Sequence, residues 1–213
     1  MKIIILFLTL IAFPIIAQID VAKEPHHIGL FKNNQIQILN GDLKKGDTSF
    51  FHIHTRPSIV FVFNDSHTNG QDIDQTWKEN KRKAGNVIFK QFEKPQVHRT
   101  TNLNLENYQM HDVEILTTPN NNTAIPLTQF TNNLEIKNKY VLGYRVELAQ
   151  RYIKFKARFF TLITIIKGEN IPIKFSNKQT INYAKKDFIT LQPGESIKFF
   201  KKTNSEIFIT EIL

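Results

Sequence analysis

The chain contains no cysteine in its 213 residues, and this absence excludes several kinds of site at once. Disulfides, thiolate metal centres and a lipid attached to an N-terminal cysteine all need the missing side chain. Glycine is also scarce, with eight dispersed residues and no glycine-rich phosphate loop. The Gly-x-Ser-x-Gly elbow and the His-Glu-x-x-His zinc motif are absent as well. The sequence therefore offers none of these motifs of hydrolases, zinc proteases or nucleotide-binding proteins.

Only one apolar run is long enough to suggest export or a membrane, and it stands at the start of the chain. The short basic start Met1-Lys2 is followed by an apolar stretch that ends on Ala17. This stretch is shorter than the about 20 residues that span a bilayer, and Pro14 interrupts it. We predict a signal peptide over residues 1–17, cleaved after Ala17, and a periplasmic or secreted protein without stable membrane insertion. A membrane anchor is the alternative reading.

Acidic residues are fewer than basic ones, 19 against 28, which gives a net charge of +9. Removing the predicted signal peptide takes away only Lys2, so the remaining charge is about +8. The basic residues are scattered, and no nucleic-acid-binding motif accompanies them. The charge therefore indicates a solvated basic surface, and we expect no nucleic-acid partner.

Alternating apolar and polar residues, separated by turn signals, predict an all-β chain. The clearest predicted strands of the first half are residues 35–39, 48–54, 59–63, 86–92, 97–99 and 108–116. Residues 64–83 are polar and contain Asn69-Gly70, a strong turn signal. We expect a long excursion there, with one short helical or strand segment near Trp77.

The second half of the chain repeats the order of the first. Residues 137–148 parallel 32–43, residues 162–166 parallel 59–63, and residues 207–213 parallel 113–116. A repeat of about a hundred residues predicts two units that each close their own sheets. We place these domains at residues 18–118 and 129–213, with an Asn-rich linker at 119–128.

Histidines supply the sharpest chemical signal. His52 and His54 stand one residue apart on a predicted strand, so their side chains point to the same face. Gly46 precedes His52 with five residues between, and Gly85, His98 and Asn102 follow later in the chain. A single ion or ligand could touch both imidazoles of the first pair.

These residues resemble the cupin superfamily. Its first motif is a Gly, five residues, His-X-His, three or four residues and a Glu, and its second motif ends in a His with an Asn four positions on. His52 and His54 match the first motif and His98 the second, although the interval from Gly85 to His98 is two residues longer than the family pattern. The resemblance implies two tandem cupin-type jelly-roll barrels.

In that family the histidines bind a divalent metal, commonly iron, manganese, nickel or zinc. By motif position the resemblance implies His52, His54 and His98 as the metal ligands. Imidazole suits all four ions, so the sequence does not select one of them. We expect metal binding to weaken below about pH 6, where free imidazoles become protonated.

The sequence departs from the family where the Glu is expected, because Ser58 and Ile59 stand there. Three protein ligands with an open position are common in catalytic metal sites. Glu93 and His111 are both candidates for a fourth ligand, and the sequence does not choose between them. Arg56, and less so Arg99, is a candidate for pairing with a carboxylate of a small-molecule substrate.

Two further expectations concern the remaining histidines and the second unit. His26 and His27 are expected to be a solvated pair at the edge of the barrel. No histidine follows His111, and Ala157 and Phe159 are in the most direct register with His52 and His54. The second barrel is therefore predicted to be degenerate, a structural or dimerising partner, which leaves a homodimer open.

Three functions are compatible with these observations. The first is a metal-dependent oxygenase, isomerase or lyase that acts on a small molecule. The second is a non-catalytic cupin that binds a small ligand such as a sugar. The third is a structural or partner-binding exported protein. One scaffold hosts many functions, so the fold does not separate them.

Overall fold

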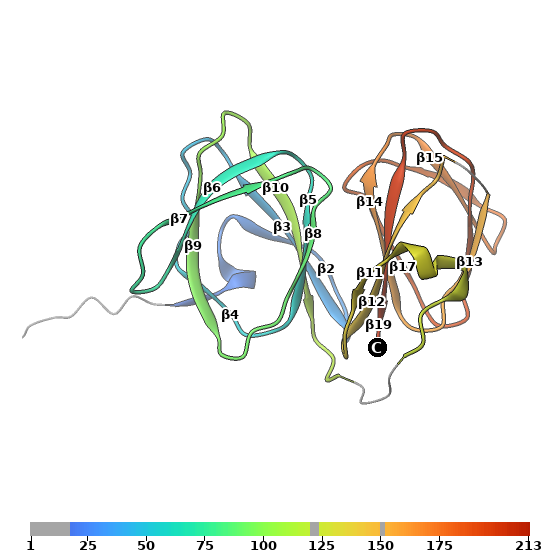
Figure 1. The fold of residues 1–213 in the computed structure, drawn as a ribbon, viewed down its shortest axis with the longest axis horizontal. Helices are drawn as coiled ribbons and strands as arrows, with labels where there is room; N and C mark the ends of the chain where they lie inside the picture. Colours follow the sequence, from blue (N-terminus) through green and yellow to red (C-terminus); the bar gives the residue numbers. More distant parts are fainter. Residues whose placement is uncertain (1–17, 120–123, 150–151) are drawn as a thin grey trace, which may run out of the picture.

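The computed structural model describes residues 18–119, 124–149 and 152–213, and it contains two β barrels side by side (Figure 1). The predicted signal peptide at residues 1–17 and residues 120–123 of the predicted linker lie outside the described residues. In the described part of the chain, no helix is long and apolar enough to cross a membrane.

The N-terminal barrel is formed by two five-stranded sheets that face each other across its interior (Figure 1). One sheet has the order β1 (Ile19–Asp20), β4 (His52–His54), β9 (Gln96–Asn102), β6 (Ser66–Asp72) and β7 (Lys78–Arg82). The other has the order β2 (His27–Lys32), β3 (Ile36–Leu43), β10 (Tyr108–Ile115), β5 (Ser58–Val62) and β8 (Val87–Lys90). A short 3₁₀ turn, η1 (Val21–Lys23), joins β1 to β2.

The C-terminal barrel repeats this architecture with one strand fewer. Its first sheet has the order β11 (Leu134–Lys137), β12 (Val141–Glu147), β19 (Glu206–Ile212), β14 (Thr161–Lys167) and β17 (Phe188–Leu191). Its second has the order β13 (Ile153–Lys156), β18 (Ser196–Phe199), β15 (Ile171–Phe175) and β16 (Thr180–Tyr183), and η2 (Thr128–Asn133) precedes β11. In the described part of the chain, every sheet takes its strands from one barrel only. The all-β fold with two jelly-roll barrels is therefore confirmed.

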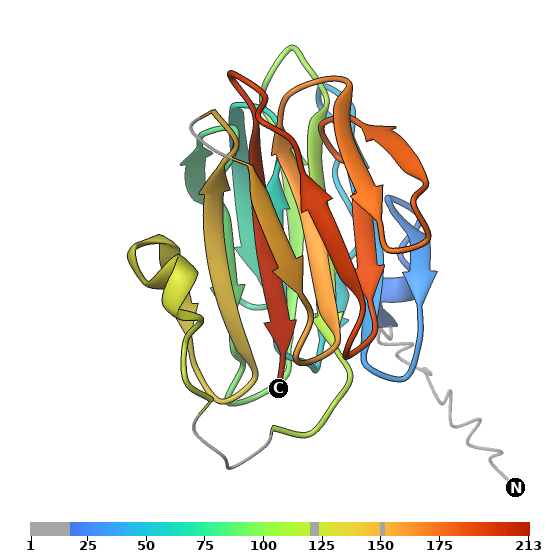
Figure 2. The same cartoon turned by 90° about the vertical axis from the view of Figure 1, so that its right-hand side faces the viewer.

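The two barrels pack through one sheet each, the sheets that contain β5 and β14 (Figures 1 and 2). Side chains of β3, β5 and β10 join side chains of β12, β14 and β19 in one buried cluster. For example, the rings of Phe61 and Phe208 meet across the contact with their centroids 5.7 Å apart. Every residue of β5 is buried because one face of the strand meets the barrel interior and the other face meets the second barrel.

The strand segment expected near Trp77 is present as β7, but the long excursion expected over the rest of residues 64–83 is wrong. This segment forms the hairpin of β6 and β7, and Asn69-Gly70 lies within β6 rather than at a turn. The chain reverses between the two strands, where Asp74 takes a positive φ of 61°. Asp is one of the residues that tolerate this conformation. Pairing of β6 with both β7 and β9 thus overrides the local turn preference of Asn-Gly.

Candidate metal centre

Three histidines meet inside the N-terminal barrel. His52 and His54 are on the same face of β4, and His98 stands directly opposite His52 on the paired strand β9. One nitrogen from each of the three lies within 4.8 Å of the others. His52 and His54 are buried, with 1% and 3% exposure, and His98 is nearly so. The strand pairing thus brings together the three residues that the sequence motifs single out.

The nitrogen positions fit a shared ion. Nε2 of His54 lies 3.0 Å from Nε2 of His98, and the three ring centroids are 4.6 to 5.0 Å apart. Two nitrogens bound at about 2.1 Å to one ion are roughly 3.0 to 3.4 Å apart. The two facing nitrogens therefore already have the separation of two metal ligands.

Acceptors on the far side of two rings leave the inner nitrogens available. Nδ1 of His52 lies 2.8 Å from the backbone oxygen of Phe50, to which it donates. Nδ1 of His54 faces Oδ2 of the buried Asp112 at 3.5 Å, which is long for a hydrogen bond. A proton held on Nδ1 by such an acceptor leaves Nε2 as a bare lone pair, as metal-binding histidines require.

The electrostatic surroundings keep these imidazoles neutral. Burial lowers the pKa of His52 to about 4 and the pKa of His54 to about 2, and the neighbouring histidines add to this effect. The pKa of His98 is lowered for the same reasons. Protons therefore compete for the folded site at lower pH than the value of about 6 expected from free imidazole. The donor set is ready for a cation across the neutral range.

A fourth histidine, His27, borders this group, and its expected solvated position is wrong. His27 is only 8% exposed, and its ring centroid is 4.8 Å from that of His52. Its Nδ1 lies 2.7 Å from Oε2 of Glu24, which is 1% exposed and also accepts from the backbone of His26 and Phe50. Burial alone raises the pKa of Glu24, but hydrogen bonds from His27 and His26 outweigh it and lower the pKa to about 2.

The N-terminal segment that carries Glu24 and His27 is anchored to β4, the strand of His52 and His54. Strand β1 pairs in parallel with β4, so that Ile19 stands opposite His52. The chain then turns through η1, where Asp20 caps the turn by accepting from the backbone of Ala22 at 2.9 Å. The run Glu24-x-His26-His27, a carboxylate next to two histidines, is the sequence signal that could have indicated this buried pair.

The two candidates for a fourth ligand do not join the three-histidine group. His111 is buried but faces the other barrel, with its ring 4.6 Å from Phe63 and 6.2 Å from Phe188. The opposite face of β10 presents Asp112 to the interior. Glu93 lies exposed in the turn after β8, at the wall of the cavity but outside the cluster.

The arginines also lie elsewhere than the sequence suggested. Arg56 is exposed and is not part of the cavity wall. Arg99 is on the outer face of its sheet, where it stacks between the rings of Phe51 and Trp77 at 4.6 and 4.8 Å. Asn102 is fully buried, and its amide donates to the backbone oxygens of Leu43 and Glu106. It holds the end of β9 in place.

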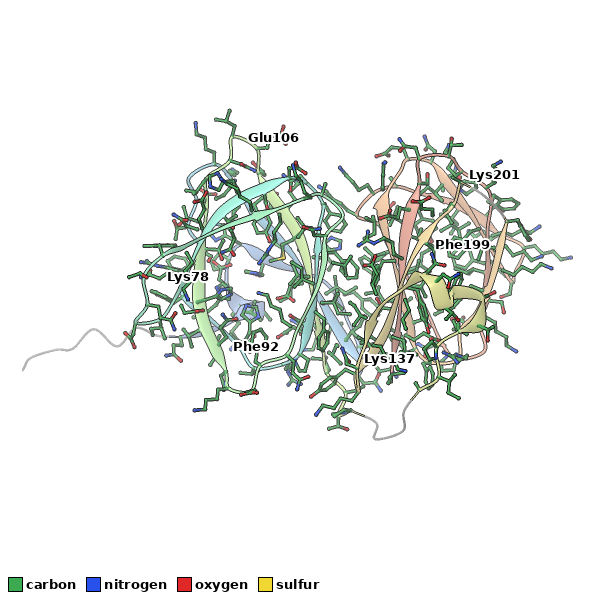
Figure 3. All side chains as sticks on the ribbon, viewed as in Figure 1. Lys78, Phe92, Glu106, Lys137, Phe199 and Lys201 are labelled. Carbon is green, nitrogen blue, oxygen red and sulfur yellow. The ribbon has the colours of Figure 1, made fainter. Side chains whose placement is uncertain are left out.

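A cavity of about 690 Å³ opens onto the three histidines. Its volume is in the range of small-molecule sites. Phe92 and Lys78, both labelled in Figure 3, belong to its wall. The wall also includes the apolar residues Val60, Phe89 and Met110 and the polar residues Arg82, Lys90, Tyr108 and Asp112. The site thus combines a possible ion-binding group with room for a small organic molecule.

Comparison with known proteins finds the fold but no relative by sequence. No family model and no curated protein matches the sequence. The E. coli protein Ylba has a similar structure, with a TM-score of 0.60 and 8% identity over 89% of this chain and 84% of that one. AerE from Microcystis aeruginosa gives a TM-score of 0.57 and 12% identity over 89% and 98%.

A third similar structure is a salicylate 1,2-dioxygenase mutant from Pseudoaminobacter salicylatoxidans in complex with gentisate. Its TM-score is 0.63, at 11% identity over 92% of this chain and 76% of that one. At such identities the likeness concerns the fold, and these neighbours are cupin-type proteins. This chain therefore has the cupin fold, in two tandem jelly-roll barrels.

Proposed function

We propose that the N-terminal barrel binds one divalent metal ion through His52, His54 and His98 and uses it in an enzymatic reaction on a small molecule. The convergence of three neutral, buried imidazoles carries this proposal. Iron, manganese, nickel and zinc all suit imidazole ligands. An ion held by three protein ligands keeps positions open for water or substrate, as catalytic sites require.

The residues of the chain have separate tasks in this proposal. The bound ion would supply Lewis-acid or redox chemistry. The carbonyl of Phe50 keeps a proton on Nδ1 of His52, and the carboxylate of Asp112 stands ready to do so for His54. The apolar wall around Val60 and Phe92 excludes water and orients the molecule bound next to the histidines.

The structural neighbours support a small organic ligand but leave the reaction type as a proposal. One of them is a dioxygenase that holds gentisate. An oxygenase is therefore the reaction class that we place first, with an isomerase or lyase as the other metal-dependent classes. The same cavity would also serve a non-catalytic protein that binds a small ligand, and metal content separates this alternative from the enzyme.

Metal analysis of the chain from residue 18 to 213, purified without added metal, tests the proposal. We expect about one transition-metal ion per chain. Each of the variants His52→Ala, His54→Ala and His98→Ala should lower metal content at least about 10-fold, because each removes a ligand. The matched control His67→Ala changes a histidine that pairs with Glu79 outside the cavity, and it should retain the metal. If the wild-type protein binds none of the four ions after incubation with each of them, the proposal is overturned.

We also propose that the chain is exported, with cleavage after Ala17 and a mature protein in the periplasm or outside the cell. A cut at this position leaves β1 and Glu24 intact, which supports the proposal because both belong to the site. N-terminal sequencing of the protein from its native host should give Gln18 as the first residue. A chain that still begins at Met1 in a membrane fraction would show an anchor instead.

A further inference from the structure

The cavity contains a lysine that, among the described residues, forms neither an ion pair nor a hydrogen bond. Lys90 ends β8, where it stands opposite Ser58 of β5, and it lines the cavity together with the three histidines. Among the described residues, no carboxylate lies within 4.0 Å of its ammonium and no side chain or backbone group accepts a hydrogen bond from it. Half-buried lysines usually have such a partner.

A second cation of the same cavity lacks a carboxylate as well. Arg82, at the end of β7, donates to the hydroxyl oxygen of the buried Tyr108 at 3.2 Å. Among the described residues, no acidic side chain pairs with it. Burial chiefly lowers the pKa of Lys90; the charges of Asp112 and Asp72 oppose this effect, and the nearby charge of Arg82 adds to it. One guanidinium group, of Arg82, and one ammonium group, of Lys90, thus face the same cavity.

The charge balance at the histidines points the same way. Three neutral imidazoles add no negative charge to a divalent ion, so the nearest protein carboxylates stand behind the rings, Asp112 at His54 and Glu24 at His27. Asp112 is a fully buried carboxylate of the cavity wall; burial raises its pKa, and the charge of Lys90 offsets part of this rise. A metal-loaded site therefore carries a net positive charge in a poorly solvated space. Such a site favours an anionic ligand, because burying an unpaired charge is costly.

The remaining wall suits an apolar body. Phe92 lies beside the centre, with its ring centroid 5.7 Å from that of His54. Val60, Phe89 and Met110 line the same space. The volume of about 690 Å³ accommodates a molecule of one or two rings.

We propose that the ligand is a small organic carboxylate with an apolar body, whose negative group lies between Lys90 and the three-histidine centre and within reach of Arg82. This inference rests on the proposed function and names its substrate class. Arg82 offers paired donors that match a carboxylate, and Lys90 offers a point charge. The negative charge that the three histidines do not supply comes from the ligand.

Calorimetric titration of the metal-loaded chain with matched probes tests the proposal. The probes are benzoate, phenylacetate and hexanoate, each compared with its primary amide. At least one carboxylate should bind about 10-fold or more tightly than its amide, because only the charged form meets Lys90 and the ion. Lys90→Met should remove this preference while the affinity for the amide stays the same. Lys90→Arg should retain the preference, and the control Lys198→Met, at an exposed position of β18, should not alter it.

Metal content is measured on every sample, which separates the two proposals. Metal-loaded protein that binds no carboxylate better than its amide overturns the inference and leaves the metal site standing. An unchanged preference in Lys90→Met overturns it as well. A chain that takes up no metal but binds a carboxylate through Lys90 overturns the metal proposal and supports the anion site. Thermal melting of each variant identifies any loss that comes from unfolding.

Discussion

The two barrels can be compared position by position, because β10 pairs with β3 and β5 in the same way as β19 pairs with β12 and β14. Glu114 stands opposite Ser58, and Glu211 stands opposite Thr161, so Ser58 and Thr161 correspond. His52 precedes Ser58 by six residues, and Phe155 precedes Thr161 by six, so these two residues correspond as well. His98 is paired with His52, and Ile197 is paired with Phe155. The counterparts of His52, His54 and His98 are Phe155, Ala157 and Ile197.

The same comparison extends to the charged groups near the centre. Lys90 is opposite Ser58, and Leu191 is opposite Thr161. Asp112 corresponds to Ile209. All the C-terminal counterparts are buried in one apolar cluster, which Phe199, labelled in Figure 3, also joins. Apolar side chains fill the interior of the C-terminal barrel. At the same positions the N-terminal barrel has imidazoles, a carboxylate and a lysine, which line a cavity.

The comparison also corrects the expected register of the second barrel. Phe159 is not the counterpart of His54, since it follows the end of β13 and is only partly buried. Phe155 and Ala157 occupy the inward positions instead. The prediction that this half has no histidine centre does not depend on the register, because no histidine follows His111.

Phe155→Ala gives the largest expected effect and tests the packing side of the comparison. Phe155 is 1% exposed, and removing such a ring from a core costs about 3 to 5 kcal/mol. We expect the free energy of unfolding, measured by urea denaturation, to fall by this amount while metal content stays at the wild-type level. His52→Ala should do the reverse, with loss of metal and a smaller loss of stability in the metal-free protein. Loss of metal in Phe155→Ala would show that the barrels are not independent in function.

Metal addition should stabilise one barrel more than the other. A ligand at 100 times its dissociation constant stabilises the state that binds it by about 2.7 kcal/mol. Hydrogen exchange of the backbone amides in β4 and β9 should slow accordingly, while amides in β13 and β18 should change little. Equal slowing in all four strands would mean that the barrels open as one unit, and the comparison would then hold for chemistry but not for stability.

Acid should destabilise the metal-free N-terminal barrel selectively. The pKa of His52 is lowered from the ordinary 6.5 to about 4 by burial, so the unfolded chain binds more protons between these values. Stability is therefore complete above about pH 6.5 and falls as the pH drops toward 4. At pH 5 the loss from His52 alone is about 2 kcal/mol relative to pH 8.

The measurement for this prediction is urea denaturation of the metal-free protein from pH 8 to pH 5. The variant His52→Ala should show a flatter pH dependence than the wild type. Unfolding followed by exchange in β18 should be nearly independent of pH in this range, since the C-terminal barrel has no histidine. Identical profiles for the wild type and His52→Ala would show that another group titrates.

Local patterns were sufficient to predict the all-β fold and the three histidines that meet. Alternation along a strand put His52 and His54 on one face, and the resemblance to the second cupin motif implied His98 in a distant strand, although its interval from Gly85 is two residues longer than the pattern. Both signals are short-range or depend on order along the chain. The hairpin of β6 and β7 was missed because its strands are polar and its Asn69-Gly70 signal is cancelled by pairing with β9.

The surroundings of the histidines could not be predicted because they depend on contacts between distant segments. Glu24 and His27 reach the interior only because β1 pairs with β4. Both faces of β10 are buried, so the sequence did not tell that His111 points to the second barrel and Asp112 to the cavity. Lys90 belongs to a strand whose apolar residues gave no sign of a buried charge.

The smallest expected effect concerns Asp112, the carboxylate that Ile209 replaces in the C-terminal barrel. Its Oδ2 lies 3.5 Å from Nδ1 of His54, and an anionic acceptor there raises the basicity of Nε2 toward an ion. Asp112→Asn keeps the shape and an acceptor oxygen but removes the charge. We expect metal affinity to fall about 10-fold, equivalent to about 1.4 kcal/mol.

Glu114→Gln is the matched control for this prediction, because Glu114 is a buried carboxylate on the same face of β10 that does not line the cavity. Its pKa is raised to about 7, mainly by burial and also by Asp112, so it contributes less negative charge. Titration with Co²⁺ gives both the affinity and, from the absorption spectrum, the geometry of the bound ion. Asp112→Asn should weaken binding and shift the spectrum, whereas Glu114→Gln should do neither. Equal weakening by both substitutions would mean that the overall buried charge, rather than the contact with His54, supports the ion.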